Sequence, residues 1–82
     1  MLAQGRAALR EGNLNGARQA LKRHRSRFPG GRLLQEREAL AIEVLWQSGQ
    51  QGSARQRAEA FVRAHPESPH AARLQALVGN RP

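Results

Sequence analysis

The residues that could carry catalysis are few in this chain, and their spacing does not suit it. The six acidic residues are all glutamates, and there is no Asp and no Cys. A Ser-His-Asp triad and a cysteine nucleophile are therefore both excluded. Glu36 and Glu43 share one helix face at a spacing of i,i+7, which is too far along the axis for paired acid/base work. We expect no enzymatic activity.

The three histidines raise the question of a metal site. His65 and His70 flank a Pro-Glu-Ser-Pro turn and could converge with Glu67 as an oxygen ligand. However, His65 matches Phe28 at a helix end, and His70 falls in the first turn of a helix. His24 lies on a buried helix stripe, which favours a core histidine with satisfied hydrogen bonds. We therefore predict no metal and no cofactor.

Positive charge is concentrated in one run of the sequence. This basic run comprises Lys22, Arg23, Arg25 and Arg27 and is continued by Arg32, in a chain with a formal net charge of +8. Such a run could hold phosphates, an anionic lipid surface or an acidic protein. Nucleic acid is the least expected of these partners, because the nearest aromatic ring, Phe28, lies on the stripe that faces the core. The interpretation we favour is a solvated basic face.

Length and composition indicate one small helical domain. The 82 residues suit a single domain over positions 1–82, and Ala, Leu, Arg, Gln and Glu dominate, which favours helix over strand. Without cysteine there is no disulfide framework. No apolar run is long enough for a membrane span, and the first residues lack the apolar core of a signal peptide.

Glycine and proline divide the chain into five predicted helices. Their expected ranges are 2–11, 16–28, 32–48, 53–65 and 69–78. Asn13 or Asn15 can cap the second helix, and Ser53 begins a capping box for the fourth. Ser68 followed by Pro69 is a typical helix start. The third helix is apolar over most of its circumference and should lie at the centre of an all-α fold.

The chain repeats itself with an offset of 37 residues. Each unit is a helix, a glycine turn, a helix and a proline turn, and the matching residues are Gly12, Ala17 and Pro29 with Gly49, Ala54 and Pro66. This pattern, with Gly5 as the small residue of the first helix, resembles the tetratricopeptide repeat, whose usual period is about 34 residues. The resemblance implies a right-handed α-α superhelix of two hairpins plus a C-terminal helix. The Phe-Pro-Gly-Gly and His-Pro-Glu-Ser-Pro turns are similar to those of divergent bacterial repeat proteins, many of them envelope-associated. This similarity favours the cell envelope.

In the resembling family, the first helix of each hairpin lines a concave groove that binds peptides or protein segments. Carried over through the glycine alignment, the lining positions are Arg6, Leu9, Arg10, Glu36, Ala39, Glu43, Trp46, Gln47, Arg73 and Ala76. Trp46 is then either the anchor of a bound partner or a core residue, and both interpretations stay open. The resemblance implies a non-catalytic protein-interaction or scaffold module.

Both ends of the predicted stack carry apolar side chains. By the 37-residue offset, a full first helix would begin about five residues before Met1, so we expect either a fragment of a longer repeat protein or a short first helix. The expected edge residues are Leu2, Leu74, Leu77 and Val78. A second interpretation is therefore head-to-tail self-assembly through these edges. A third is a basic module that binds nucleic acid or an anionic surface.

Overall fold

Five helices occur in the part of the chain that the computed structural model describes, which is residues 2–28, 30 and 33–79. They are α1 (Leu2–Arg10), α2 (Leu14–Arg27), α3 (Leu34–Gln47), α4 (Gln51–Ala64) and α5 (Pro69–Gly79). No strand occurs among these residues. The predicted all-α fold is therefore confirmed. Within the same residues, no helix combines the length and the apolar character that a membrane crossing needs.

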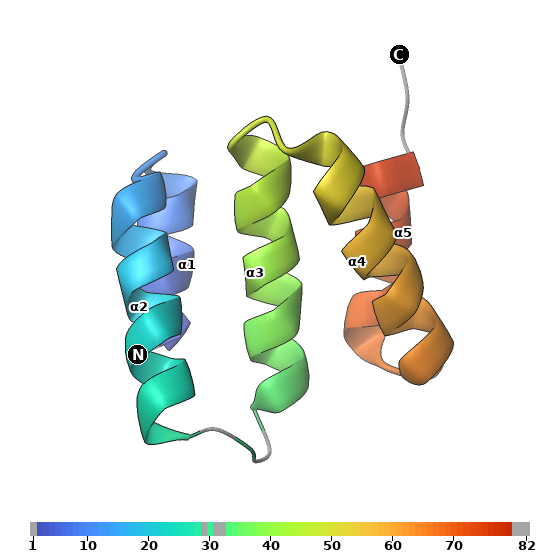
Figure 1. The fold of residues 1–82 in the computed structure, drawn as a ribbon, viewed down its shortest axis with the longest axis horizontal. Helices are drawn as coiled ribbons and strands as arrows, with labels where there is room; N and C mark the ends of the chain where they lie inside the picture. Colours follow the sequence, from blue (N-terminus) through green and yellow to red (C-terminus); the bar gives the residue numbers. More distant parts are fainter. Residues whose placement is uncertain (1, 29, 31–32, 80–82) are drawn as a thin grey trace.

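Helix α3 lies at the centre of the molecule (Figure 1). It contacts each of the other four helices, with α1 and α2 on one side and α4 and α5 on the other. Among the described residues, the α1–α2 pair makes no contact with the α4–α5 pair. The wide apolar surface predicted for α3 follows from this position, because a helix with neighbours on two sides buries two stripes.

The buried core consists of two clusters that meet in α3. The first cluster joins α1, α2 and α3 through Leu2, Leu9, Ala17, Leu21, Leu40 and Val44. The second joins α3, α4 and α5 through Ala39, Ile42, Ala54, Ala58, Phe61, Ala71, Leu74 and Val78. Neighbours in sequence such as Ala39 and Leu40 serve different clusters, because successive helix positions are about 100° apart. Helix α3 therefore connects the two halves of the molecule, the α1–α2 pair and the α4–α5 pair.

The two glycine turns share one geometry, 37 residues apart. Gly12 and Gly49 have φ angles of 77° and 90°, a left-handed conformation that glycine adopts without the steric cost of a Cβ. In both turns, the residue after the glycine donates its backbone N–H to the carbonyl five positions earlier, at 2.8 and 3.0 Å. The repeat seen in the sequence is thus present in the backbone hydrogen bonds.

The starts of α2 and α4 follow these turns. Helix α2 begins at Leu14, two residues earlier than predicted, and Asn13 caps it by accepting a hydrogen bond from Gly16 N at 3.0 Å. Helix α4 begins at Gln51, so Ser53 lies inside its first turn, and the predicted capping box there is wrong. The physical reason is the preceding glycine turn, which starts α4 at the repeat position where α2 starts.

The other helix boundaries agree with the prediction to within two residues, which is the usual ambiguity of helix ends. The start of α5 is as expected. Pro69 is its first residue, and Ser68 Oγ accepts a hydrogen bond from His70 N at 3.2 Å. This cap fixes the position of His70 at the beginning of α5.

Candidate functional site

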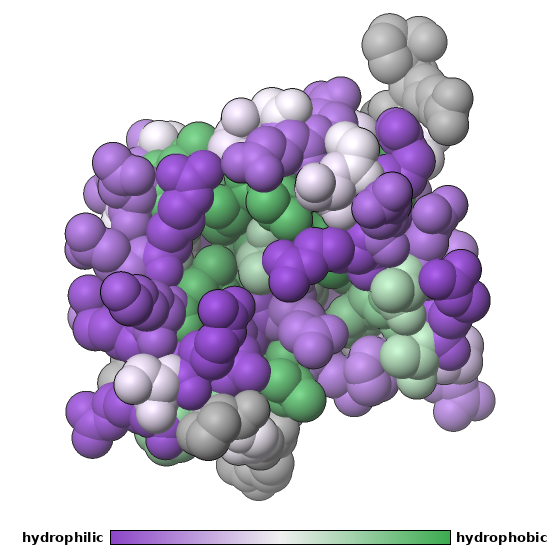
Figure 2. Space-filling model, viewed as in Figure 1, coloured by the Kyte–Doolittle hydropathy of each residue, from purple (hydrophilic) through white to green (hydrophobic). Residues whose placement is uncertain are grey.

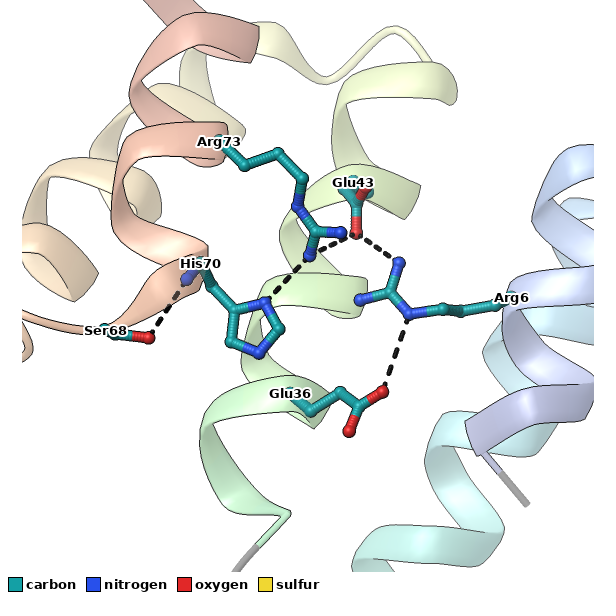
Figure 3. A network of polar contacts seen from close by, with 6 residues as sticks. All are labelled: Arg6, Glu36, Glu43, Ser68, His70 and Arg73. Carbon is teal, nitrogen blue, oxygen red and sulfur yellow. Dashed lines mark hydrogen bonds and ion pairs between the residues drawn. The ribbon is translucent and has the colours of Figure 1, made fainter.

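A network of charged side chains connects α1, α3 and α5 (Figure 3). Arg6 of α1 donates a hydrogen bond from Nη1 to Glu43 Oε2 at 3.1 Å, and its Nε lies 3.7 Å from Glu36 Oε1. Arg73 of α5 places its Nη2 3.6 Å from the same Glu43 oxygen. Ion pairs thus join three helices that are far apart in the sequence. We call this surface the α1–α3–α5 face.

The centre of this network is largely shielded from solvent. The side chains of Arg6 and Glu43 are only 21% and 18% exposed, so water and salt screen their attraction less than that of a surface pair. Arg6 Nη2 is buried and has no hydrogen-bond partner among the described residues. A buried donor without an acceptor costs free energy. The network therefore holds one guanidinium in place while leaving one of its donors unsatisfied.

His70 extends the network along α5. Arg73 Nη2 lies 3.0 Å from His70 Nδ1, and since arginine can only donate, this contact requires a neutral ring with Nδ1 as acceptor. Burial lowers the pKa of His70, and the Arg73 guanidinium lowers it further. The sequence analysis did not place His70 on this face. Its spacing of three residues from Arg73 on one helix was the available signal.

One ion pair of the network, Arg6–Glu43, joins equivalent positions of successive repeats. Glu43 stands 37 residues after Arg6, and Arg73 stands 37 residues after Glu36. Consecutive units therefore carry opposite charges at two equivalent positions. Arg6 and Glu43 are in contact when the units stack, and their attraction supports the repeat geometry, whereas Arg73 lies beside Glu43.

Apart from Trp46, the predicted groove residues separate into three groups in the structure. Four of them meet in the network: Arg6, Glu36, Glu43 and Arg73. Arg10, Gln47 and Ala76 are exposed. Leu9 and Ala39 are 7% and 0% exposed in the two core clusters, so the expectation that they line an open groove is wrong. Their helix positions turn toward neighbouring helices, where apolar burial is favourable.

Trp46 lies at the boundary between core and surface. Its side chain is half-buried and packs against the cluster shared by α3, α4 and α5. The Arg55 guanidinium lies 5.9 Å from the ring centre, within the range of a cation–π contact. Arg55 is itself held by hydrogen bonds to Val78 O at 3.1 and 3.3 Å. The indole therefore packs on the core with one portion exposed to solvent, and its role as a partner anchor stays a prediction.

The remaining histidines have structural surroundings. His24 is 4% exposed, its Nδ1 lies 3.5 Å from Arg37 Nη1, and its ring centre lies 5.2 Å from that of Phe28. Burial lowers the pKa of His24, and Arg37 lowers it further, so the predicted core histidine is confirmed. His65 packs against Phe61 with ring centres 5.0 Å apart. In the described ranges, no three His, Cys, Asp or Glu side chains are grouped as metal ligands.

The basic run is exposed wherever the structure describes it. Lys22, Arg23, Arg25 and Arg27 all lie on the surface of α2, whereas Arg32 is outside the described residues. Among the described residues, none of these four forms an ion pair. The charges belong to α2 and not to the α1–α3–α5 face, so the basic run and the charged network are separate features.

Three of the four predicted assembly-edge residues are buried. Leu2, Leu74 and Val78 are 5%, 0% and 6% exposed, so the expectation that they form open apolar edges is wrong. Leu2 belongs to the first core cluster, and the other two pack in the second. The reason is that α5 contacts both α3 and α4 and turns its apolar stripe toward them. Leu77 is half-buried against the same cluster.

These observations define the class of protein. The chain has two helical hairpins whose glycine turns share one geometry and are related by a constant offset, and the first helix of a third unit follows them. This arrangement is a tetratricopeptide-like helical repeat. The family model of YfiO, described as an outer membrane lipoprotein, matches residues 1–79, and the chain belongs to this family. The resemblance found in the sequence is thereby confirmed, and the family description agrees with the expected cell envelope. Neither a curated protein nor a solved structure matches the chain.

Proposed function

We propose that this chain is a non-catalytic protein-interaction module of the cell envelope, which binds a segment of a partner protein along the α1–α3–α5 face. The observation that carries the proposal is the ion-pair network of this face, in which Arg73 lies beside Glu43 while its own side chain remains 46% exposed. A carbonyl or carboxylate oxygen of a partner would accept a hydrogen bond from the exposed part of the Arg73 guanidinium. The helical repeat architecture supports the same conclusion, since such stacks present extended binding surfaces.

Residues near the network supply further contacts for a partner. Arg10 and Gln47 lie one helical turn beyond Arg6 and Glu43, and both are exposed. They offer polar groups for the backbone of an extended segment. Trp46 neighbours Gln47 and offers the open part of a rigid indole, a residue type that is enriched among binding hot spots. The face thus combines a fixed charge centre with adaptable polar groups and one aromatic anchor.

Site-specific crosslinking tests this proposal. A photoreactive amino acid placed at Gln47 should capture a partner from an envelope extract, whereas the same group at Gln19, which is exposed on α2, should not. The captured protein is then identified, purified and titrated against the 82-residue chain. With that partner, Trp46→Ala should raise Kd by roughly tenfold or more, and Gln19→Ala should leave it unchanged. Equal capture from both positions, or equal affinity of both variants, would contradict binding on this face.

A further inference from the structure

A cleft lies on another side of the molecule, between α2 and α4 and over α3. Its volume is about 510 Å³, and its lining comes from these three helices. Figure 2 shows this side of the molecule, with apolar surface visible between hydrophilic side chains. None of the residues of the charged network lines the cleft. It is therefore a second candidate surface, independent of the proposed function.

The cleft exists because α2 and α4 both pack on α3 without touching each other in the described residues. Small side chains, Ala41, Ala60 and Ala64, leave the space between them open. Its base is apolar and firm, since Ile42 and Phe61 are each 3% exposed. The volume falls in the range of about 300–1,000 Å³ that is typical of ligand sites. The cleft can thus accommodate apolar side chains of a bound molecule.

The charges that line the cleft are mainly positive. Arg25 from α2, Arg37 from α3 and Arg57 from α4 face a single acidic residue, Glu38. Arg37 is 6% exposed and is anchored by donating a hydrogen bond to Phe28 O at 2.7 Å. Arg25 and Arg57 are exposed, and neither forms an ion pair with another described residue. Arg25 on the α2 side and Arg57 on the α4 side are therefore available to pair with negatively charged groups of a ligand.

From this arrangement we infer that the cleft binds an acidic, amphipathic segment of a partner protein. Apolar side chains of the segment occupy the recess over Phe61, and its carboxylates pair with Arg25 and Arg57. A second copy of this chain does not fit the site, because each copy carries a net charge of +8 and has only six acidic residues. A recess between two helices also suits side chains better than it suits the flat surface of a membrane.

The test uses the 82-residue chain and a fluorescent synthetic peptide at 150 mM salt. The peptide is a 16-residue amphipathic helix former with leucines on one face and glutamates elsewhere. We expect saturable binding by fluorescence anisotropy, with Kd raised at least tenfold in the double variant Arg25→Gln/Arg57→Gln. The matched control is Arg23→Gln/Arg63→Gln, which removes two exposed charges from the same helices outside the cleft. It should change Kd by less than threefold.

Two further comparisons separate this site from its alternatives. A peptide with serines in place of the leucines should bind at least fivefold more weakly, because the apolar recess would be unused. Arg10→Gln on the α1–α3–α5 face should leave Kd unchanged. If Kd rose equally in the cleft variant and in its matched control, the weaker binding would follow from the lower net charge alone, and the inference would be overturned. The inference would also be overturned if the chain bound phosphatidylglycerol vesicles through Arg25 and Arg57 and did not bind the peptide.

Discussion

Each repeat has one histidine and one phenylalanine ring at the end of its second helix, and the two rings stand in opposite order in the two repeats. In the first repeat His24 is buried and Phe28 is 51% exposed, so the expectation that Phe28 faces the core is wrong. In the second repeat Phe61 is 3% exposed and His65 is half-buried. The ring centres are 5.2 and 5.0 Å apart in the two pairs. Because the first repeat buries the ring that can ionise, the free energy of unfolding should depend on pH through His24.

The direction of this pH dependence follows from the lowered pKa of His24. In the unfolded chain His24 has the ordinary histidine pKa of about 6.5. In the folded chain its pKa is lower, so the ring takes up a proton only at a lower pH. The free energy of unfolding should therefore be highest above pH 6.5 and decrease as the pH falls toward the folded pKa. His70, whose pKa is also lowered, contributes in the same direction.

Exchanging the two rings of the first repeat tests this assignment. The double variant His24→Phe/Phe28→His buries an apolar ring and exposes the imidazole, as in the second repeat. Its free energy of unfolding should decrease less between pH 7.5 and pH 5 than that of the wild type, because position 24 no longer titrates. Urea titrations at the two pH values measure the difference. An unchanged pH dependence would show that His24 is not responsible.

At the scale of the helices, a close approach between α1 and its neighbours occurs at Gly5. A Cβ at this position would lie 2.9 Å from Leu40 Cδ2 and 3.2 Å from Ala20 Cβ. Leu40 and Ala20 are 0% and 1% exposed, so neither can move aside freely. The small residue that the repeat resemblance required in the first helix is therefore needed for α1 to contact α2 and α3 together.

A pair of glycine substitutions separates this packing effect from helix propensity. Gly5→Val should lower stability by about 1–3 kcal/mol, because the added methyl groups overpack the junction. Gly52 lies in α4 with nothing within 4 Å of a Cβ. Gly52→Ala should be neutral or stabilising by up to about 1 kcal/mol. Thermal melts of both variants measure the contrast, and a Gly5→Val chain as stable as the wild type would refute the close approach.

For the whole molecule, the important feature is that α3 contributes to both core clusters. Leu40 and Val44 face the first cluster, and Ala39 and Ile42 face the second. Since α1 and α2 make no described contact with α4 and α5, coupling between the two halves runs through this helix. Loss of packing on one side of α3 should therefore weaken the other side as well.

Leu40→Ala tests this coupling. Leu40 is 0% exposed, so its truncation should cost about 2–5 kcal/mol, a large part of the roughly 4–12 kcal/mol expected for a domain of this length. Hydrogen exchange should accelerate in α4 and α5 as well as in α1 and α2. Leu33→Ala, at a position that is 48% exposed, should change stability by less than about 0.5 kcal/mol. Faster exchange confined to α1 and α2 would show that the halves unfold independently.

The sequence by itself determined the elements and their repetition. Gly12 and Gly49 marked the turns, Pro69 marked the start of α5, and the apolar circumference of residues 32–48 predicted a central helix. These features are local, because backbone angles and helix periodicity depend on residues within one or two turns. The constant offset then led to the correct repeat family without any knowledge of packing.

Only the tertiary structure decided which side chains meet. Arg6 and Glu43 are 37 residues apart, and their contact at 3.1 Å depends on how α1 and α3 pack. The same packing buried Leu74, which the sequence placed at an open edge, and separated α2 from α4 to leave the cleft over Phe61. Helix crossing angles and distances arise from many simultaneous side-chain contacts, and no local pattern contains them.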